Sequence, residues 1–243
     1  LRWIAPTDLF VELGTEVGRG RTFPASDASR NGFGAWSLFG RLGGDLGTAA
    51  WRAGLSLLRA SPRERSFEDE DSLANTVTQS FSGRTRLWIA DLVVKWPRFK
   101  VQGEYFRRQE SGTLTYDDSA SAAPQFGVPF ADAYASRQSG WYGQLVYDLA
   151  PRWRAGYRYD RLSRGSVENT IVANALGPAA ADFPLLMAQH NPTRNTVMLD
   201  WSPTEFSRWR LQLALDKSRI GVTDRQVLLQ YIHSLGAHSA HRF

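Results

Sequence analysis

The 243-residue chain contains no cysteine and no run of 18 apolar residues. The lack of cysteine excludes a disulfide scaffold, thiolate metal sites and a cysteine nucleophile. The lack of a long apolar run excludes a transmembrane helix. The chain also has no basic block: its net charge is +5, but lysines and arginines are interspersed with acidic residues. This distribution disfavours binding to nucleic acid.

Nine tryptophans and 42% hydrophobic residues accompany a mean hydropathy of −0.36. Alternation reconciles these values, because apolar and polar residues follow one another at period two, as in strands with one apolar face. In 141–149, for example, Trp141, Leu145 and Tyr147 share one face, and Gln144 and Asp148 share the other. The clearest strands are predicted at 9–17, 51–57, 141–149, 153–159, 209–216 and 226–231, and less regular ones at 34–45, 84–96, 98–108 and 194–202.

Short turns and long connections alternate along the chain. Short turns follow the second, fourth, sixth and eighth predicted strands, at Gly47, Pro97, Pro151 and Pro203. Long connections rich in Ser, Ala, Gly, Asp and Pro follow the first, third, fifth and seventh. Bacterial outer-membrane barrels have this layout, with short periplasmic turns and long outer loops.

We therefore predict an all-β fold, an antiparallel transmembrane β-barrel in the bacterial outer membrane, with ten strands visible and residues 1–243 forming one domain. Trp3-Ile4-Ala5-Pro6 echoes the turn at Trp201-Ser202-Pro203. Residues 1–5 thus read as the stub of an earlier strand. On this reading the chain is the C-terminal part of a larger barrel, and ten strands are a minimum.

The tryptophans lie near the predicted strand ends, where a membrane barrel carries its interfacial aromatics. The alternative is that they pack in the core of a soluble β-sandwich. The residues assigned to an aromatic girdle are Trp36, Trp51, Trp88, Trp96, Trp141, Trp153, Trp201 and Trp209.

Charged residues occupy the alternate face, which would line the lumen. A soluble core could not hold so many charges without a large desolvation cost. Two interpretations stay open: a water-filled pore with weak charge selectivity, and a lumen closed by salt bridges. Arg152, Arg154 and Arg158 form either an anion-attracting ladder or pairs with neighbouring carboxylates. The candidate pore-lining residues are Glu12, Glu16, Arg52, Asp91, Lys95, Lys100, Glu104, Arg108, Asp148, Arg154, Arg158, Asp200, Arg210 and Asp216.

Arginines also gather near the outer strand ends. One interpretation is that they meet lipopolysaccharide phosphates, which suit the guanidinium fork, and the other is that they form a solubilising rim. The arginines in question are Arg19, Arg21, Arg84, Arg107, Arg137, Arg161 and Arg164.

Three of the four histidines lie in the last eleven residues, at His233, His238 and His241. Clustered imidazoles invite a zinc site, but in an extended strand spacings of five and three put neighbouring histidines on opposite faces, without carboxylate or thiolate partners. They are weak metal candidates, and we predict no metal site and no cofactor. The aromatic C-terminus, Phe243, is typical of barrels recognised by the outer-membrane assembly machinery.

Several segments resemble a group of proteobacterial outer-membrane β-barrel proteins described as porin-like or as zinc-regulated and TonB-dependent-receptor-like. The resemblance is carried by segments 87–91, 102–108, 139–142, 157–162 and 230–238, and by the tail Gly-Ala-His-Ser-Ala-His-Arg-Phe, which matches a Gly-Ala-His-x-Ala-His-x-Phe ending. It implies location and fold more firmly than a substrate, and neither a plug domain nor a TonB box is evident.

The predicted function is porin-like passage or uptake of small solutes or metal ions, with outer-membrane lipid and lipopolysaccharide as partners and no enzymatic activity. One alternative is a structural or adhesive barrel with a salt-bridged lumen and functional outer loops. Another, from a different class, is a soluble carbohydrate-binding β-sandwich that uses tryptophans as stacking platforms.

Overall fold

The computed structural model describes residues 1–21, 33–70, 76–121, 124, 127–169 and 190–235. Its twelve strands form one sheet in the order β1-β2-β3-β4-β6-β7-β8-β9-β10-β11-β12, with β5 paired to β6 outside this path. All neighbours are antiparallel. These pairings confirm the all-β antiparallel prediction, whereas the β-sandwich alternative is wrong because the described strands belong to a single sheet. Among the described residues, no helix is long and apolar enough to cross a bilayer.

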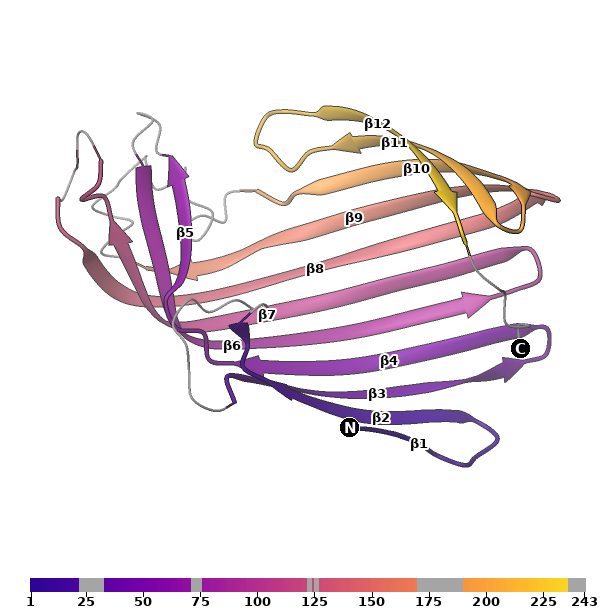
Figure 1. Cartoon of the computed structure of the whole chain (residues 1–243), viewed down its shortest axis with the longest axis horizontal. Helices are drawn as coiled ribbons and strands as arrows, with labels where there is room; N and C mark the ends of the chain where they lie inside the picture. The colour runs from indigo at the N-terminus through magenta and orange to yellow at the C-terminus, as the bar shows by residue number, and fades with distance from the viewer. Residues whose placement is uncertain (22–32, 71–75, 122–123, 125–126, 170–189, 236–243) are drawn as a thin grey trace.

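The strands lengthen toward the middle of the sheet (Figure 1). Their bounds are β1 Arg2–Ile4, β2 Phe10–Gly18, β3 Ala35–Leu46, β4 Ala49–Ala60, β5 Arg65–Glu70, β6 Thr76–Lys95, β7 Phe99–Asp117, β8 Phe130–Ala150, β9 Trp153–Glu168, β10 Thr193–Thr204, β11 Ser207–Asp216 and β12 Asp224–His233. Each of the ten predicted segments lies within or overlaps one of these strands. The turns that join β3 to β4 and β6 to β7 lie at one end of the sheet, and β5 lies at the other (Figure 1).

One strand and several strand extensions differ from the prediction. β1 lies where the strand stub is expected and pairs with β2, whereas β5 lies in a predicted loop. At the long-connection end, β6 begins at Thr76, β7 continues to Asp117, β8 begins at Phe130 and β9 continues to Glu168. These extensions are rich in Ser, Thr and Gln, and their few large apolar residues, such as Val77, Phe81 and Leu114, lie on one face. The period-two hydrophobic signal is therefore weak there, although the backbone pairing continues.

A small buried core holds the extensions together. Phe81 and Leu114 are fully buried, and the ring of Phe81 meets that of Tyr134 edge to face, with centroids 5.4 Å apart. Val77 on β6 is fully buried as well. β5 pairs with this part of β6, from Arg65 opposite Phe81 onward. The core thus lies at the long-connection end and not along the main body of the sheet.

The strands are staggered across the sheet. A row of paired residues that starts at Val94, one residue from the end of β6, passes through Val101 to Leu145, five residues from the end of β8. The same row reaches Val197, seven residues from the end of β10. A sheet that closes into a barrel needs tilted strands and such a shear.

Candidate functional site

One face of the sheet exposes large apolar side chains from β1 to β12. Leu13 is 51% exposed, Leu55 54%, Leu145 47% and Leu213 46%, although all lie within strands. A water-soluble protein rarely leaves a contiguous apolar surface of this extent uncovered. The strand positions between these residues point to the opposite face, because successive side chains alternate.

Four aromatic residues form one row on the apolar face beside the short turns. Trp153, Trp201, Trp209 and Tyr231 are directly paired on β9, β10, β11 and β12. The rings of Trp153 and Trp201 stack with centroids 6.0 Å apart, and those of Trp209 and Tyr231 lie 4.6 Å apart. Amphipathic rings gather in this way where apolar surface meets water.

The other predicted girdle residues lie at both ends of the sheet. Trp96 stacks on Phe99 at 4.5 Å beside a short turn, and Trp51 lies close to another. At the long-connection end, Trp36, Trp88 and Trp141 occupy the apolar face; Trp88 is 37% exposed and Trp141 44%. Within the described residues, the rings therefore mark the two borders of an apolar band. Their role as a membrane girdle stays a prediction.

The opposite face carries a continuous row of acidic and basic residues. Its members are directly paired from strand to strand, from β2 to β12: Glu12, Arg41, Gly54, Asp91, Glu104, Tyr142, Asp160, Arg194, Asp216 and Asp224. A Cβ at Gly54 would displace the carboxylate of Asp91 from its present position. Arg52, one row away, reaches Asp91 at 3.7 Å.

Glu12 begins this row and is almost completely buried, with 1% of its surface exposed. Arg41 on β3 donates a hydrogen bond of 3.1 Å to its carboxylate, and Arg2 on β1 forms a second ion pair with it. The two guanidiniums compensate a carboxylate whose burial alone would be costly.

Asp200 on β10 gathers three arginines from both neighbouring strands. Arg210 on β11 donates two hydrogen bonds to its carboxylate, at 2.7 and 2.8 Å. Arg154 on β9 lies 3.7 Å away and Arg208 on β11 lies 3.8 Å away. Asp200 is 1% exposed, whereas the arginine side chains retain 24 to 31% of their surface. The cluster thus places three guanidiniums around one carboxylate near the short-turn end of this face.

The prediction of an arginine ladder on β9 is wrong for Arg152, which lies outside the strand. Arg152 lies in the turn before β9 with a φ of 74°, outside the strand alternation. Arg154 belongs to the Asp200 cluster. Arg158 donates hydrogen bonds to Asp160 of its own strand and lies over the ring of Tyr142, 3.7 Å from its centroid. Both strand arginines are therefore paired with carboxylates.

The remaining candidates share this face by register. Lys95 and Lys100 are opposite one another at the β6–β7 turn, and both are exposed. Glu104 lies opposite Asp91, and Asp148 opposite Arg154. The other two, Glu16 and Arg108, lie nearer the long-connection end of β2 and β7. Which of these residues line a pore stays a prediction.

Sequence reasoning missed Arg2, Arg41, Arg194 and Arg208, which belong to the charged face. Arg194 pairs with Asp216 at 3.8 Å. Arg41 is an even number of residues from Asp45, and Arg194 is an even number from Asp200, so each pair shares one face of its strand. Strict alternation through 34–45 and 194–202 would therefore have found both arginines.

Metal candidates receive no support from geometry. Within the part of the chain that is described, no three His, Cys, Asp or Glu residues converge as metal ligands. His233 ends β12, with its Nδ1 3.5 Å from the Tyr231 hydroxyl. His238, His241 and Phe243 lie outside the described residues.

Comparison with known proteins assigns no family. No family model matches the chain. An uncharacterized protein of Aquifex aeolicus (strain VF5) is 26% identical over 266 residues, which cover all of this chain and 50% of that protein. The chain thus spans half the length of this relative.

Solved structures with some likeness include two described as monoaromatic hydrocarbon or toluene transporters. The toluene transporter TbuX of Ralstonia pickettii is 9% identical, with a TM-score of 0.42 over 90% of this chain and 67% of that one. The channel CymD is 8% identical, with a TM-score of 0.44 over 93% of this chain and 70% of that one. Similarities this weak assign neither a function nor a substrate.

Proposed function

We propose that the chain forms the wall of a bacterial outer-membrane β-barrel that passes small solutes or ions through a mixed-charge lumen. The observation that carries this proposal is the division of one sheet into an exposed apolar face and a charged face. An apolar band bordered by aromatic rings suits contact with lipid, and the stagger of the strands suits a barrel wall. The short turns then face the periplasm and the long connections face outward.

Charges on the inner face support aqueous contact in the lumen. Six of the ten residues in the row from Glu12 to Asp224 are acidic and two are arginines. Ion pairs compensate several of them, but within the described residues no ion pair within 4 Å involves Glu104. A carboxylate without a close ion-pair partner, although within range of the charge of Arg158, suits an element that attracts cations.

Planar-bilayer recording tests the proposal. We expect discrete conductance steps from the purified chain and a lower cation-to-anion permeability ratio after Glu104→Lys. Glu205→Lys is the matched control, because Glu205 is exposed in the β10–β11 turn, off the charged face. Equal changes in both variants would remove Glu104 from the lumen. Absence of conductance from a folded, membrane-inserted chain would favour the alternative of a structural barrel closed by salt bridges.

A further inference from the structure

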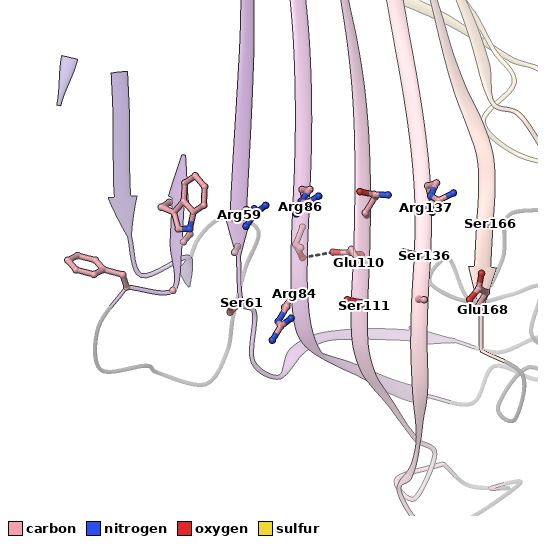
Figure 2. A pocket seen from close by; sticks show the side chains of 18 residues that line it. Arg59, Ser61, Arg84, Arg86, Glu110, Ser111, Ser136, Arg137, Ser166 and Glu168 are labelled. Carbon is pink, nitrogen blue, oxygen red and sulfur yellow. Dashed lines mark hydrogen bonds between the residues drawn. The ribbon is translucent and has the colours of Figure 1, made fainter. Parts of the chain in front are cut away.

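A pocket of about 670 Å³ lies where the apolar face ends, at the long-connection side of β4, β6, β7 and β8. Its walls come from two successive rows that share the apolar face. Arg59, Arg86, Gln109 and Arg137 are directly paired in one row, and Arg84 and Ser111 belong to the next. Figure 2 shows Arg59 on β4, Arg86 on β6 and Arg137 on β8 at one level, with Arg84 beyond them. Between these two rows lies a row formed by Ala60, Thr85, Glu110 and Ser136. Its side chains point to the other face, so its backbone forms the floor of the pocket.

The four arginines of this pocket are exposed and lack carboxylate partners. None of Arg59, Arg84, Arg86 and Arg137 forms an ion pair in the described part of the chain. Arg59 only covers the ring of Trp36, 5.6 Å from its centroid. Like charges directly opposite on adjacent strands destabilise a sheet, so the pairing of Arg59 with Arg86 has a cost that a bound anion would remove.

Carboxylates inside the pocket do not balance these charges. Glu168 is on the same face as Arg84 and is the one acidic side chain there among the lining residues. Glu110 also contributes to the lining, but its carboxylate accepts hydrogen bonds from Arg65 and Thr85 on the other face. Four guanidiniums against one free carboxylate make a site for a doubly charged anion, since each guanidinium presents a fork that matches phosphate oxygens.

An apolar groove of about 590 Å³ lies over β1, β2, β3, β4 and β6, and shares β3, β4 and β6 with the pocket. Leu38, Leu57 and Trp88 form the next lipid-facing row below Trp36, Arg59 and Arg86, two residues further along β3, β4 and β6. Two residues of an extended strand span roughly 7 Å. Leu55, Leu13 and Trp3 extend the groove over Gly40 toward the edge strand β1.

We propose that the arginine pocket and the groove together bind a phosphorylated, multiply acylated glycolipid of the outer leaflet, with phosphates on Arg59, Arg84, Arg86 and Arg137 and an acyl chain over Gly40. The two sites lie side by side, and this ligand fills both. A soluble phosphate would leave the groove empty, and an uncharged lipid would leave the arginines unpaired. The inference rests on the membrane location in the proposed function, and it adds a ligand on the outside of the wall.

Native mass spectrometry of the full chain in detergent micelles, with bisphosphorylated lipid A as the probe, tests the site. We expect Arg59→Gln/Arg86→Gln to weaken lipid A binding about ten-fold or more, as two charge-assisted hydrogen-bonding groups are lost. The matched control is Lys217→Gln/Arg225→Gln, which removes two exposed charges at the same end of the sheet outside the pocket. Equal weakening in both double variants, or none in the first, would overturn the proposal.

A second experiment tests whether the ligand is a lipid or a free phosphate. It compares the binding of lipid A and of pyrophosphate to a variant in which the groove is filled. A Cβ at Gly40 meets only the end of the flexible Leu13 side chain, at 3.3 Å, so Gly40→Leu fits and fills the groove. We expect it to weaken lipid A binding several-fold and to leave pyrophosphate binding unchanged. Unchanged lipid A binding would leave a site for a free phosphate and overturn the lipid assignment.

Folding in the same micelles separates this proposal from the proposed function. Strand content by circular dichroism and partition into detergent report on the barrel, independently of the arginines. A chain that folds and inserts but binds lipid A without dependence on the pocket overturns the lipid site alone. A chain that stays in aqueous buffer without detergent overturns both.

Discussion

The Asp200 carboxylate shows how single residues determine the charged face. It is nearly inaccessible, it accepts two hydrogen bonds from Arg210, and it also lies near Arg154 and Arg208. Removing one partner of a buried ion pair is far more damaging than removing an exposed one, because the remaining charges lose their compensation. Here one carboxylate serves three cations, so its loss leaves three guanidiniums facing one another.

We predict that Asp200→Asn lowers the free energy of unfolding by about 3–5 kcal/mol, in line with broken buried pairs. Denaturant titration in detergent micelles, followed by tryptophan emission, measures this change. Asp216→Asn on the adjacent strand is the control, since its partner Arg194 lies 3.8 Å away and is 37% exposed. Its expected cost is below about 1 kcal/mol. Similar losses in the two variants would contradict the special role of Asp200.

Alternation in the sequence predicts which face such residues occupy but not their partners. Asp200, Arg154 and Arg210 were assigned to one face from parity alone, and the register agrees. Their convergence depends on which residues of β9 and β11 lie opposite β10, and register between strands is absent from a period-two pattern. Arg152 was misassigned for a related reason, because the strand begins one residue later, at Trp153.

At the scale of elements, β5 is held to the sheet by its backbone pairing with β6 and by a buried ion pair to β7. Arg65 on β5 donates hydrogen bonds of 2.8 and 3.1 Å to Glu110 on β7, and Thr85 on β6 donates another of 2.8 Å. The guanidinium also lies 4.9 Å from the centroid of the Phe81 ring. These residues lie in the strand extensions past the aromatic border, outside the proposed membrane-spanning stretch.

We predict that Arg65→Met detaches β5 while the main sheet stays folded. The change leaves Glu110 buried without its bidentate partner, at a cost of about 3–5 kcal/mol. Amide hydrogen exchange should show lost protection in 65–70 and retained protection in β8 and β9. Asp117→Asn on β7 is the matched control, because that exposed carboxyl bonds only to Ser119 nearby and should leave β5 protected. Loss of protection throughout the sheet would contradict the prediction.

Acid should release β5 through the same pair. Burial raises the pKa of the Glu110 carboxyl, but the hydrogen bond from Arg65 and the charges of Arg108 and Arg65 outweigh burial, so the pKa lies below its usual value. A depressed carboxyl pKa contributes stability that is complete above the unfolded-state pKa, near 4.3, and is lost as pH falls through the folded-state value. Exchange protection of β5 should therefore be constant near neutral pH and fall in acid. Glu110→Gln should abolish this pH dependence; an unaltered profile would contradict the assignment.

The sequence did not predict β5, and the reason is physical. Its residues, Arg-Ser-Phe-Glu-Asp-Glu, show no apolar alternation, and its partner stretch on β6 has two large apolar residues, Val77 and Phe81, among four polar ones. The strand exists because of contacts from distant parts of the chain, with Arg65 reaching a carboxylate 45 residues away. Local pattern carries no information on such pairing.

At the scale of the whole molecule, the two faces of the sheet require opposite environments. Leu213 on the apolar face is 46% exposed, between Val197 and Val227, which are 49% and 72% exposed. Its chain neighbour Gln212 points to the charged face, lies between Met198 and Leu228 in register, and lines a pocket with Arg194 and Asp216. If lipid covers the first face and water the second, adjacent positions must respond oppositely to charge.

We predict that Leu213→Arg lowers the free energy of unfolding from phosphatidylcholine vesicles by about 2–4 kcal/mol, the cost of a lipid-facing arginine near the midplane of a barrel. Gln212→Arg, one residue away and with the same final side chain, should cost much less, because water and nearby carboxylates can accept it. Denaturant titration of both variants in the same vesicles, read by tryptophan emission, makes the comparison. In detergent-free buffer a soluble protein would tolerate arginine at exposed Leu213 better than at Gln212. A reversed order of the two costs would therefore contradict the lipid-facing assignment, and with it the barrel.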